Sequence, residues 1–294
     1  MKHDPDRQAL AAALAAVLLW STVATGFKLG LAVMAPLQLL LAGTIISAVF
    51  FAAVATARRR WVMTGRNLLE AAAFGIVNPA LYYLVLFEAY DRLPAQLAQP
   101  LNYTWAITLA VLAVPVLKQR LTQRTLAGIL VSYLGVLVLL SQGRFDQLPA
   151  VDWVGVALAL GSTVLWAGYW LMNARSRTDP VGLMALSFLI ATPLVAIACA
   201  LGPGLPRLDW SVLWFGAWVG LVEMGVTFLL WQRAMRLTSH AARIGQLIFL
   251  SPFISLILIS TVLGETIHWT SVLGLGVIVG GVLVTRSSAS ERAR

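Results

Sequence analysis

The sequence has few charged residues and a single cysteine. Asp, Glu, Lys and Arg make up 11% of the 294 residues, whereas soluble domains spend about a quarter of their residues on these four types. This shortage, the 60% share of apolar residues and the mean hydropathy of +0.84 exclude a soluble globular protein. The lone Cys199 excludes a disulfide scaffold, and the apolar content excludes a disordered chain.

Long polar segments are also scarce, and the apolar residues gather in ten runs. A helix of about 20 apolar residues crosses a bilayer core of about 30 Å. The runs lack the period-two alternation of barrel strands, so we expect an all-α polytopic membrane protein. The short loops leave no room for a nucleotide-binding or other soluble domain. The predicted spans are residues 9–27, 35–57, 68–87, 93–117, 125–140, 154–172, 181–201, 212–231, 241–263 and 272–285.

Basic residues are divided unevenly between the two sides that ten spans define. Sixteen fall on the side of the tails and four on the other, and cytoplasmic loops are the ones enriched in Lys and Arg. We therefore predict cytoplasmic termini in an inner (plasma) membrane, and contact of the +9 charge with anionic lipid rather than nucleic acid. The run 9–27 is predicted to remain as a span instead of being cleaved as a signal peptide. The sixteen are Lys2, Arg7, Arg58, Arg59, Arg60, Arg66, Lys118, Arg120, Arg124, Arg175, Arg177, Arg233, Arg236, Arg286, Arg292 and Arg294, and the four are Lys28, Arg92, Arg144 and Arg207.

Matching residues recur at a nearly constant offset and indicate an internal repeat. Leu19-Trp20 matches Leu165-Trp166 at 146 residues, and Gly135 matches Gly281 at the same offset. The predicted units are a tail 1–8, five-helix halves 9–141 and 152–285, and a tail 286–294, both tails cytoplasmic. Five is odd, so the halves are predicted to be inverted, with a site near the midplane as in secondary transporters. The alternative is compositional similarity between apolar helices, against which the order of the matches argues.

Two charges lie deep within the predicted spans. A charge at the centre of a membrane helix costs about 2.5–3.5 kcal/mol on insertion scales, and Glu223 and Arg243 occupy such positions in the eighth and ninth spans. One interpretation is a mutually satisfied ion pair that holds the bundle or an inner gate. The other is that Glu223 faces a substrate ammonium or carries a coupling proton, while Arg243 attracts a carboxylate.

The third and fourth spans carry polar residues beside prolines. Proline inside a membrane helix frees a carbonyl and kinks the axis, so Pro79 and Pro100 are candidate flexible points. Residues four apart share a helix face, which predicts a common face for Asn78 with Tyr82. The alternative for these side chains is hydrogen-bonded packing between helices, which we favour for Gln96. The candidate substrate ligands here are Asn78, Tyr82, Tyr83, Gln99, Asn102 and Tyr103, the pair Gln99 and Tyr103 sharing a face as well.

Two tryptophans differ from the others in being deep and equivalent in the repeat. Trp20 and Trp166 could hold a ring by stacking and an ammonium by cation–π contact, with Tyr169 one turn from Trp166. The alternative is that these aromatic side chains only pack the bundle. Interfacial anchoring is the simpler interpretation for Trp61, Trp153, Trp210, Trp214 and Trp269.

Signals of an enzyme or a metal site are missing from the spans. All seven Asp residues lie in predicted loops, tails or helix ends, and the sequence has no G-x-S-x-G motif. His240 and His268 have no other potential metal ligands at a suitable spacing in the sequence. We predict no enzyme, no cofactor and no metal. The pairs Gly216–Gly220 and Gly276–Gly280 have the spacing of close helix contacts, either within the chain or at a weak homodimer seam.

Each predicted half ends in a charged turn followed by a last helix that contains several glycines. In the second half these are Gly264-Glu265 in the turn and Gly274 and Gly280-Gly281 in the helix. In this the chain resembles the EamA-type members of the drug/metabolite transporter superfamily, and Leu101-Asn102-Tyr103 before Trp105 resembles the YddG-type aromatic amino-acid exporters. The resemblance implies a ten-helix basket that exports aromatic and other neutral amino acids.

The internal repeat, the proline kinks and the resemblance to the EamA-type transporters together predict a secondary transporter that exports small neutral solutes by alternating access. The loops 91–94 and 233–238 are candidates for pacing the cycle. Proton coupling and facilitated diffusion remain open. A drug/metabolite or sugar-type permease of the same fold is the first alternative, followed by a membrane enzyme and by a structural or receptor protein.

Overall fold

The computed structural model describes residues 5–117, 122–145, 150–238 and 241–290, with the side chains of 117, 241–243 and 285–290 excepted. Every regular element in this part of the chain is a helix. In order they are α1 (Pro5–Ser21), α2 (Val23–Leu31), α3 (Pro36–Ala57), α4 (Gly65–Gly75), the π-helical η1 (Ile76–Leu81), α5 (Tyr82–Arg92), α6 (Ala95–Tyr103), α7 (Trp105–Leu117), α8 (Gln123–Ser141), α9 (Trp153–Arg175), α10 (Pro180–Leu201), α11 (Trp210–Ala217), the π-helical η2 (Trp218–Val226), α12 (Thr227–Leu237), α13 (Ala241–Gln246), the 3-10 turn η3 (Leu247–Leu250), α14 (Ser251–Leu263) and α15 (Trp269–Ser290).

The all-helical membrane architecture predicted from composition is confirmed for these described residues. Nine of their helices are long and apolar enough to cross a membrane, each overlapping one of the first nine predicted spans. The tenth predicted span corresponds to a shorter apolar helix, Trp269–Val284. The first helix begins at Pro5, inside the segment that we assigned to a tail, because a polar first turn can precede the apolar run of a membrane helix.

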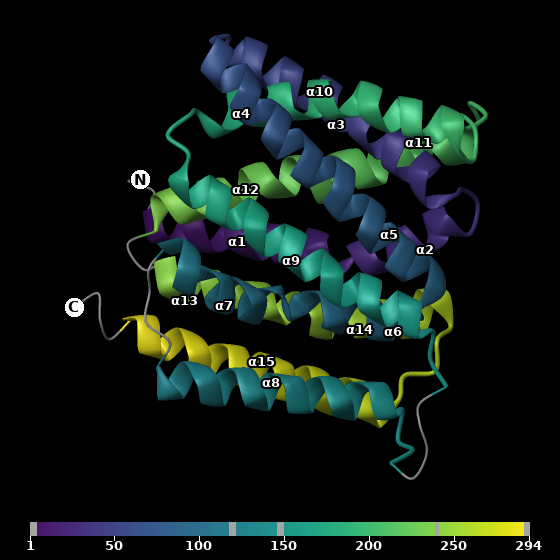
Figure 1. The fold of residues 1–294 in the computed structure, drawn as a ribbon, viewed down its shortest axis with the longest axis vertical. Coiled ribbons are helices and arrows are strands. Elements are labelled where there is room, and N and C mark those ends of the chain that lie inside the picture. The colour runs from purple at the N-terminus through teal and green to yellow at the C-terminus, as the bar shows by residue number, and fades with distance from the viewer. Residues whose placement is uncertain (1–4, 118–121, 146–149, 239–240, 291–294) are drawn as a thin grey trace.

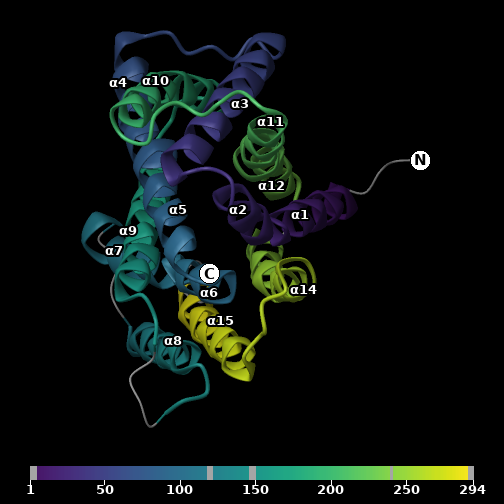
Figure 2. The same cartoon turned by 90° about the vertical axis from the view of Figure 1, so that its right-hand side faces the viewer.

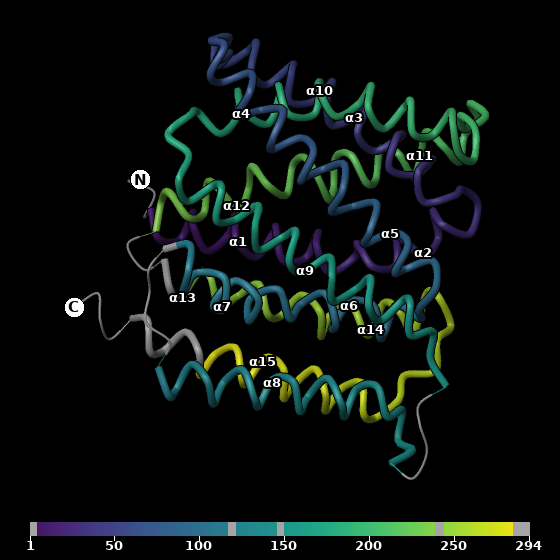
Figure 3. Tube along the Cα trace, viewed as in Figure 1, coloured from purple at the N-terminus to yellow at the C-terminus, as the bar shows by residue number. Residues whose placement is uncertain are grey.

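The helices run roughly side by side, so that the bundle has two ends (Figure 1). α1 begins and α15 ends at one of them, which we call the terminal end. α6 begins, and the loop before α15 lies, at the other, which we call the opposite end (Figure 1). α8 and α15, far apart in sequence, lie next to each other along one edge of the molecule in Figures 2 and 3.

Glycines allow the close packing of α8 against α15. A Cβ added at Gly281 would lie 2.1 Å from Ser132 Oγ and 2.4 Å from the Gly128 carbonyl oxygen. The Ser132 hydroxyl donates a hydrogen bond of 3.0 Å to the carbonyl of Ile278. Neighbouring Gly280 has no atom within 4 Å of its added Cβ among the described residues. Only one of two adjacent glycines is therefore required by the packing.

The two glycine pairs singled out in the sequence differ in their surroundings. Cβ atoms added at Gly216 and Gly220 would lie 2.8 Å from Ala42 Cβ and 2.7 Å from the Gly43 carbonyl oxygen. This pair therefore packs α11 and η2 against α3. Gly276 and Gly280 meet nothing within 4 Å in the part of the chain described, so this pair makes no close contact there and the homodimer seam stays a prediction.

The adjacent glycines of α15 provide a matched test of this packing. Gly281→Ala is expected to lower the free energy of unfolding by about 1–3 kcal/mol through overpacking against α8, whereas Gly280→Ala should be neutral or stabilising because alanine favours the helix. The buried thiol of Cys199 is the chain's single cysteine, so its labelling by a thiol-reactive dye during heating reports unfolding. Equal melting temperatures for the two variants would contradict the assigned helix contact.

Aspartates at the ends of loops begin three of the membrane helices. The Asp152 carboxylate accepts a hydrogen bond of 3.0 Å from the backbone N–H of Gly155, which lies in the first turn of α9. This bond lowers the pKa of Asp152 below its usual value, and the positive charge of Arg92, whose Nη1 lies 3.5 Å from Asp152 Oδ2, lowers it further. Asp179 and Asp209 cap α10 and α11 in the same way. Capping therefore explains why these carboxylates stand outside the spans.

The two predicted halves are tied together at the opposite end by Glu265 and Gln96. Glu265 accepts hydrogen bonds from the backbone N–H groups of Ala95 at 2.8 Å and Gln96 at 3.2 Å, so its carboxylate lies on the N-terminus of α6. The Gln96 side chain donates to the Thr266 carbonyl and accepts from Ser271 Oγ at 2.8 Å. Gln96 therefore has the packing role favoured from the sequence.

Candidate functional site

A cavity of about 70 Å³ lies among helices from both predicted halves, and we call it the central cavity. α1, α2, α5, α6 and α7 contribute residues of the first half, and α9, η2 and η3 contribute residues of the second. Seven residues predicted to bind or couple line it, namely Trp20, Tyr82, Gln99, Asn102, Tyr103, Trp166 and Glu223. The shared face predicted for Gln99 and Tyr103 is therefore confirmed.

A second cavity of about 60 Å³ lies nearer the terminal end, and we call it the terminal cavity. Its walls come from α4, η1, α9, α10 and α12, close to the last turns of α9 and α12 and the first turn of α10. Asn78 and Tyr169, both predicted substrate ligands, line this cavity and not the central one. The predicted site residues are thus divided between two spaces.

The backbone at Asn78 explains this division. Asn78 has φ −147° and ψ 114°, which lie outside the helical region and break the helix within η1, directly before Pro79. The prediction that Asn78 and Tyr82 share a helix face is therefore wrong, because that inference assumed a continuous α-helix. The π-helical η2 contains Glu223, the approximate repeat equivalent of Asn78. π-helical segments often mark functional sites, and η2 carries the buried Glu223, whereas η1 joins two helices across a kink at Asn78.

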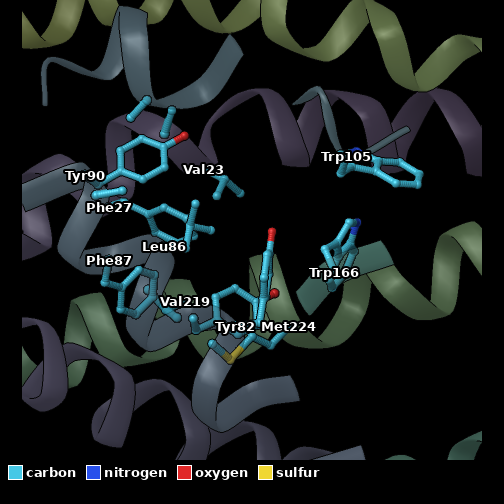
Figure 4. Close-up of a cluster of buried hydrophobic side chains, with 14 of the residues drawn as sticks. Val23, Phe27, Tyr82, Leu86, Phe87, Tyr90, Trp105, Trp166, Val219 and Met224 are labelled. Carbon is cyan, nitrogen blue, oxygen red and sulfur yellow. The ribbon is translucent and has the colours of Figure 1, made fainter. Parts of the chain in front are cut away.

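Stacked aromatic rings separate the two cavities. Trp166 stacks on Tyr82 at a centroid distance of 4.6 Å and on Tyr169 at 5.5 Å, and it meets Phe228 edge-on at 6.1 Å. Tyr82 and Trp166 line the central cavity, whereas Tyr169 and Phe228 line the terminal one. Figure 4 shows the rings of Tyr82 and Trp166 next to each other. We call Tyr82, Trp166, Tyr169 and Phe228 the aromatic layer.

Glu223 lies at the central cavity, where the Tyr83 hydroxyl and the Trp20 indole interact with its carboxyl. It is 8% exposed, and its Oε1 accepts a bond of 3.0 Å from the hydroxyl of Tyr83. Its Oε2 is buried and has no hydrogen-bond partner among the described residues. Tyr83, a predicted substrate ligand, lines neither cavity and instead positions this carboxyl. A buried acid with one unpartnered oxygen is available to a cationic group in the cavity.

The pairing proposed for Glu223 and Arg243 falls outside what can be described. Arg243 lies in α13, and its side chain is outside the described residues. The ion pair therefore stays a prediction. The contact of Tyr83 with Glu223 was not foreseen, because the separation of 140 residues between them leaves no local signal.

Other buried polar atoms at the central cavity also lack partners. Gln99 Oε1 can accept a hydrogen bond and Trp170 Nε1 can donate one, yet neither makes one within the described part of the chain. Asn102 differs, since it donates to Ser162 Oγ at 2.9 Å and accepts from Tyr82 at 3.5 Å. Asn102 thus positions the Tyr82 ring, whereas Gln99 and Trp170 can bind a solute.

The chemistry of these groups suits a molecule that carries both hydrogen-bond donors and acceptors. Glu223 Oε2 and Gln99 Oε1 supply two acceptors, which suit an ammonium group. Trp170 Nε1 supplies a donor, which suits a carboxylate. Trp20 and Trp166 offer aromatic faces for a ring or a cation. The described residues hold no cluster of His, Cys, Asp and Glu that would suit a metal ion.

Comparison with known proteins identifies relatives along the whole chain. The EamA-like transporter family matches residues 7–141 and again residues 153–287. The chain is 23% identical over 298 residues to the uncharacterized transporter YvbV of Bacillus subtilis (strain 168), covering 100% of this chain and 96% of that protein. It is 26% identical over 278 residues to the aromatic amino acid exporter YddG of Ancylobacter novellus, covering 92% and 93%.

Two further similarities concern substrate and fold. The threonine/homoserine exporter RhtA of Escherichia coli (strain K12) is 26% identical over 224 residues, which cover 74% of this chain and 72% of that protein. A solved crystal structure matches with a TM-score of 0.67 at 20% identity, covering 97% of this chain and 99% of that one. This structural likeness shows a common fold.

Proposed function

The chain belongs to the EamA-like transporter family and is a multi-pass membrane transporter, and from this premise we propose that it exports small neutral amino acids, aromatic ones above all. The observation that carries this proposal is the central cavity. There, unpartnered acceptors on Glu223 and Gln99 and an unpartnered donor on Trp170 lie between aromatic walls. Relatives named as exporters of aromatic amino acids and of threonine and homoserine support an amino-acid substrate.

The proposed topology is ten transmembrane helices in two inverted five-helix repeats. The two family matches, 7–141 and 153–287, support two equivalent halves. Counting Trp269–Val284 as the tenth crossing agrees with the start of α1 and the end of α15 at the same end of the bundle (Figure 1). The sixteen-to-four division of basic residues supports cytoplasmic termini in the inner membrane.

The proposed transport step uses the aromatic layer as the barrier between the two ends. The solute's ammonium binds Glu223 and Gln99, its carboxylate receives the Trp170 N–H, and its side chain packs on Trp166. Movement of the halves then transfers access from one end to the other. The break in the helix at Asn78, directly before Pro79, supports Pro79 as a flexible point. Pro100 lies inside the continuous α6 and stays a candidate from the sequence, as do the loops 91–94 and 233–238 for pacing the cycle.

Transport by the purified protein in liposomes tests this function. We expect uptake of labelled phenylalanine, tryptophan and threonine above that of empty vesicles, with saturation by substrate. Phenylalanine amide and 3-phenylpropionate should compete weakly, because each lacks one of the two charged groups. Uptake of sugars or cationic drugs with no amino-acid flux would favour the alternative permease of the same fold. Failure to move any of these solutes would overturn the proposal.

A further inference from the structure

We propose that the terminal cavity is a second binding site for the transported neutral amino acid, separated from the central cavity by the aromatic layer. This inference rests on the proposed function and adds a site to it. The solute would occupy the terminal cavity on one side of the aromatic layer and the central cavity on the other. Two binding sites in one molecule are the measurable consequence.

The first observation is an unpartnered acceptor in the wall of the terminal cavity. Asn78 is 4% exposed, and its Oδ1 is buried without a hydrogen-bond partner in the described part of the chain. Its extended backbone at the η1 break removes it from the helix face that carries Tyr82. A buried amide oxygen without a partner costs free energy unless a ligand or water supplies a donor.

The second observation is the chemistry of the surrounding wall. Aromatic rings of Tyr169, Phe228 and Trp231 line it, together with the amides of Asn173 and Gln232. None of the residues that line it is charged. Such a wall suits an apolar or aromatic side chain with an ammonium group bound to Asn78, and it would bind a molecule of high net charge poorly. It therefore fits the same neutral amino acids as the central cavity.

The third observation is a residue that lines both cavities. Trp170 belongs to both walls, and its buried Nε1–H donates to no described residue. Its ring stacks on Trp105 at 6.3 Å and meets Trp166 edge-on at 5.9 Å. The Trp170 side chain is therefore shared by the walls of both proposed sites. A solute that moves between the two sites would pass alongside Trp170.

Binding stoichiometry with matched amide variants tests the inference. Equilibrium dialysis of labelled phenylalanine against the purified protein should show two binding events per chain. Asn78→Leu should weaken one event about ten- to a hundredfold, the effect of losing one hydrogen bond to a charged group, and leave the other unchanged. Gln99→Leu, the equivalent change at the central cavity, should weaken only the other event.

A second variant covers the case in which Asn78→Leu does not fold. Met184 lines the terminal cavity, so Met184→Trp should fill it and remove the same event while the protein melts as the wild type does. One binding event in the wild type, or weakening of the same event by Asn78→Leu and Gln99→Leu, would overturn the second site. Two binding events without flux in liposomes would instead overturn the proposed function and leave the second site standing.

Discussion

Replacing Glu223 with glutamine is expected to reduce transport of neutral amino acids by about ten- to a hundredfold. The substitution keeps the size of the side chain and removes its negative charge. A hydrogen bond to a charged group contributes about 1.5–3 kcal/mol, which corresponds to this range. Because Glu223 Oε2 lies unpartnered at the central cavity, the loss should fall on substrates with an ammonium group. The measurement is counterflow of labelled phenylalanine in liposomes.

An imposed pH gradient separates two roles for the same carboxyl. If Glu223 exchanges a proton during the cycle, a gradient should accelerate wild-type transport and have no effect on Glu223→Gln. If it binds only the substrate, the gradient should leave the wild-type rate unchanged while the substitution still weakens binding. The first outcome indicates proton exchange, and the second indicates facilitated diffusion.

Two further substitutions serve as controls for this result. Glu88→Gln removes a carboxylate from α5 that is 36% exposed and lies 3.9 Å from Arg92, and it should transport as the wild type does. Tyr83→Phe removes the hydroxyl that holds Glu223 Oε1 and should cause a smaller loss than Glu223→Gln. Wild-type counterflow by Glu223→Gln would show that the substrate does not use this carboxyl.

The helices of the bundle could be predicted because the bilayer imposes a simple requirement on them. Each apolar run had to be long enough to cross and had to satisfy its own backbone, and the first nine predicted spans each overlap a long apolar helix. The deep positions of Trp20 and Trp166 followed from the repeat. Both line the central cavity, where their proposed role as substrate ligands awaits its test.

The direction in which each side chain points from its helix was harder to predict than the helices themselves. Phe228 lies in the apolar first half of α12, before Gln232 and Arg233, and nothing in this local sequence marks it as part of the aromatic layer. Asn78 was assigned to the face of Tyr82 because local spacing does not reveal where a helix changes to η1. The bond between Tyr83 and Glu223 joins residues far apart in sequence. Such contacts depend on how the halves pack, which composition does not specify.

Replacing Trp166 with alanine is expected to join the two cavities and destroy the barrier between the ends of the molecule. Trp166 is 9% exposed and contacts Tyr82, Tyr169 and Phe228, members of both cavity walls. Its truncation should lower the free energy of unfolding by about 3–5 kcal/mol. Because the central member of the aromatic layer is removed, saturable counterflow should be lost and a slow, non-saturable leak of small solutes should replace it.

Other tryptophan substitutions distinguish loss of the barrier from loss of the fold. Trp166→Phe keeps a ring in the aromatic layer and should retain counterflow with a weaker affinity. Trp214→Ala truncates a side chain that is 56% exposed, and it should leave stability and flux close to those of the wild type. The leak is measured as efflux of preloaded phenylalanine from liposomes at increasing concentrations. A stable Trp166→Ala protein with intact, saturable counterflow would show that the barrier lies elsewhere in the bundle.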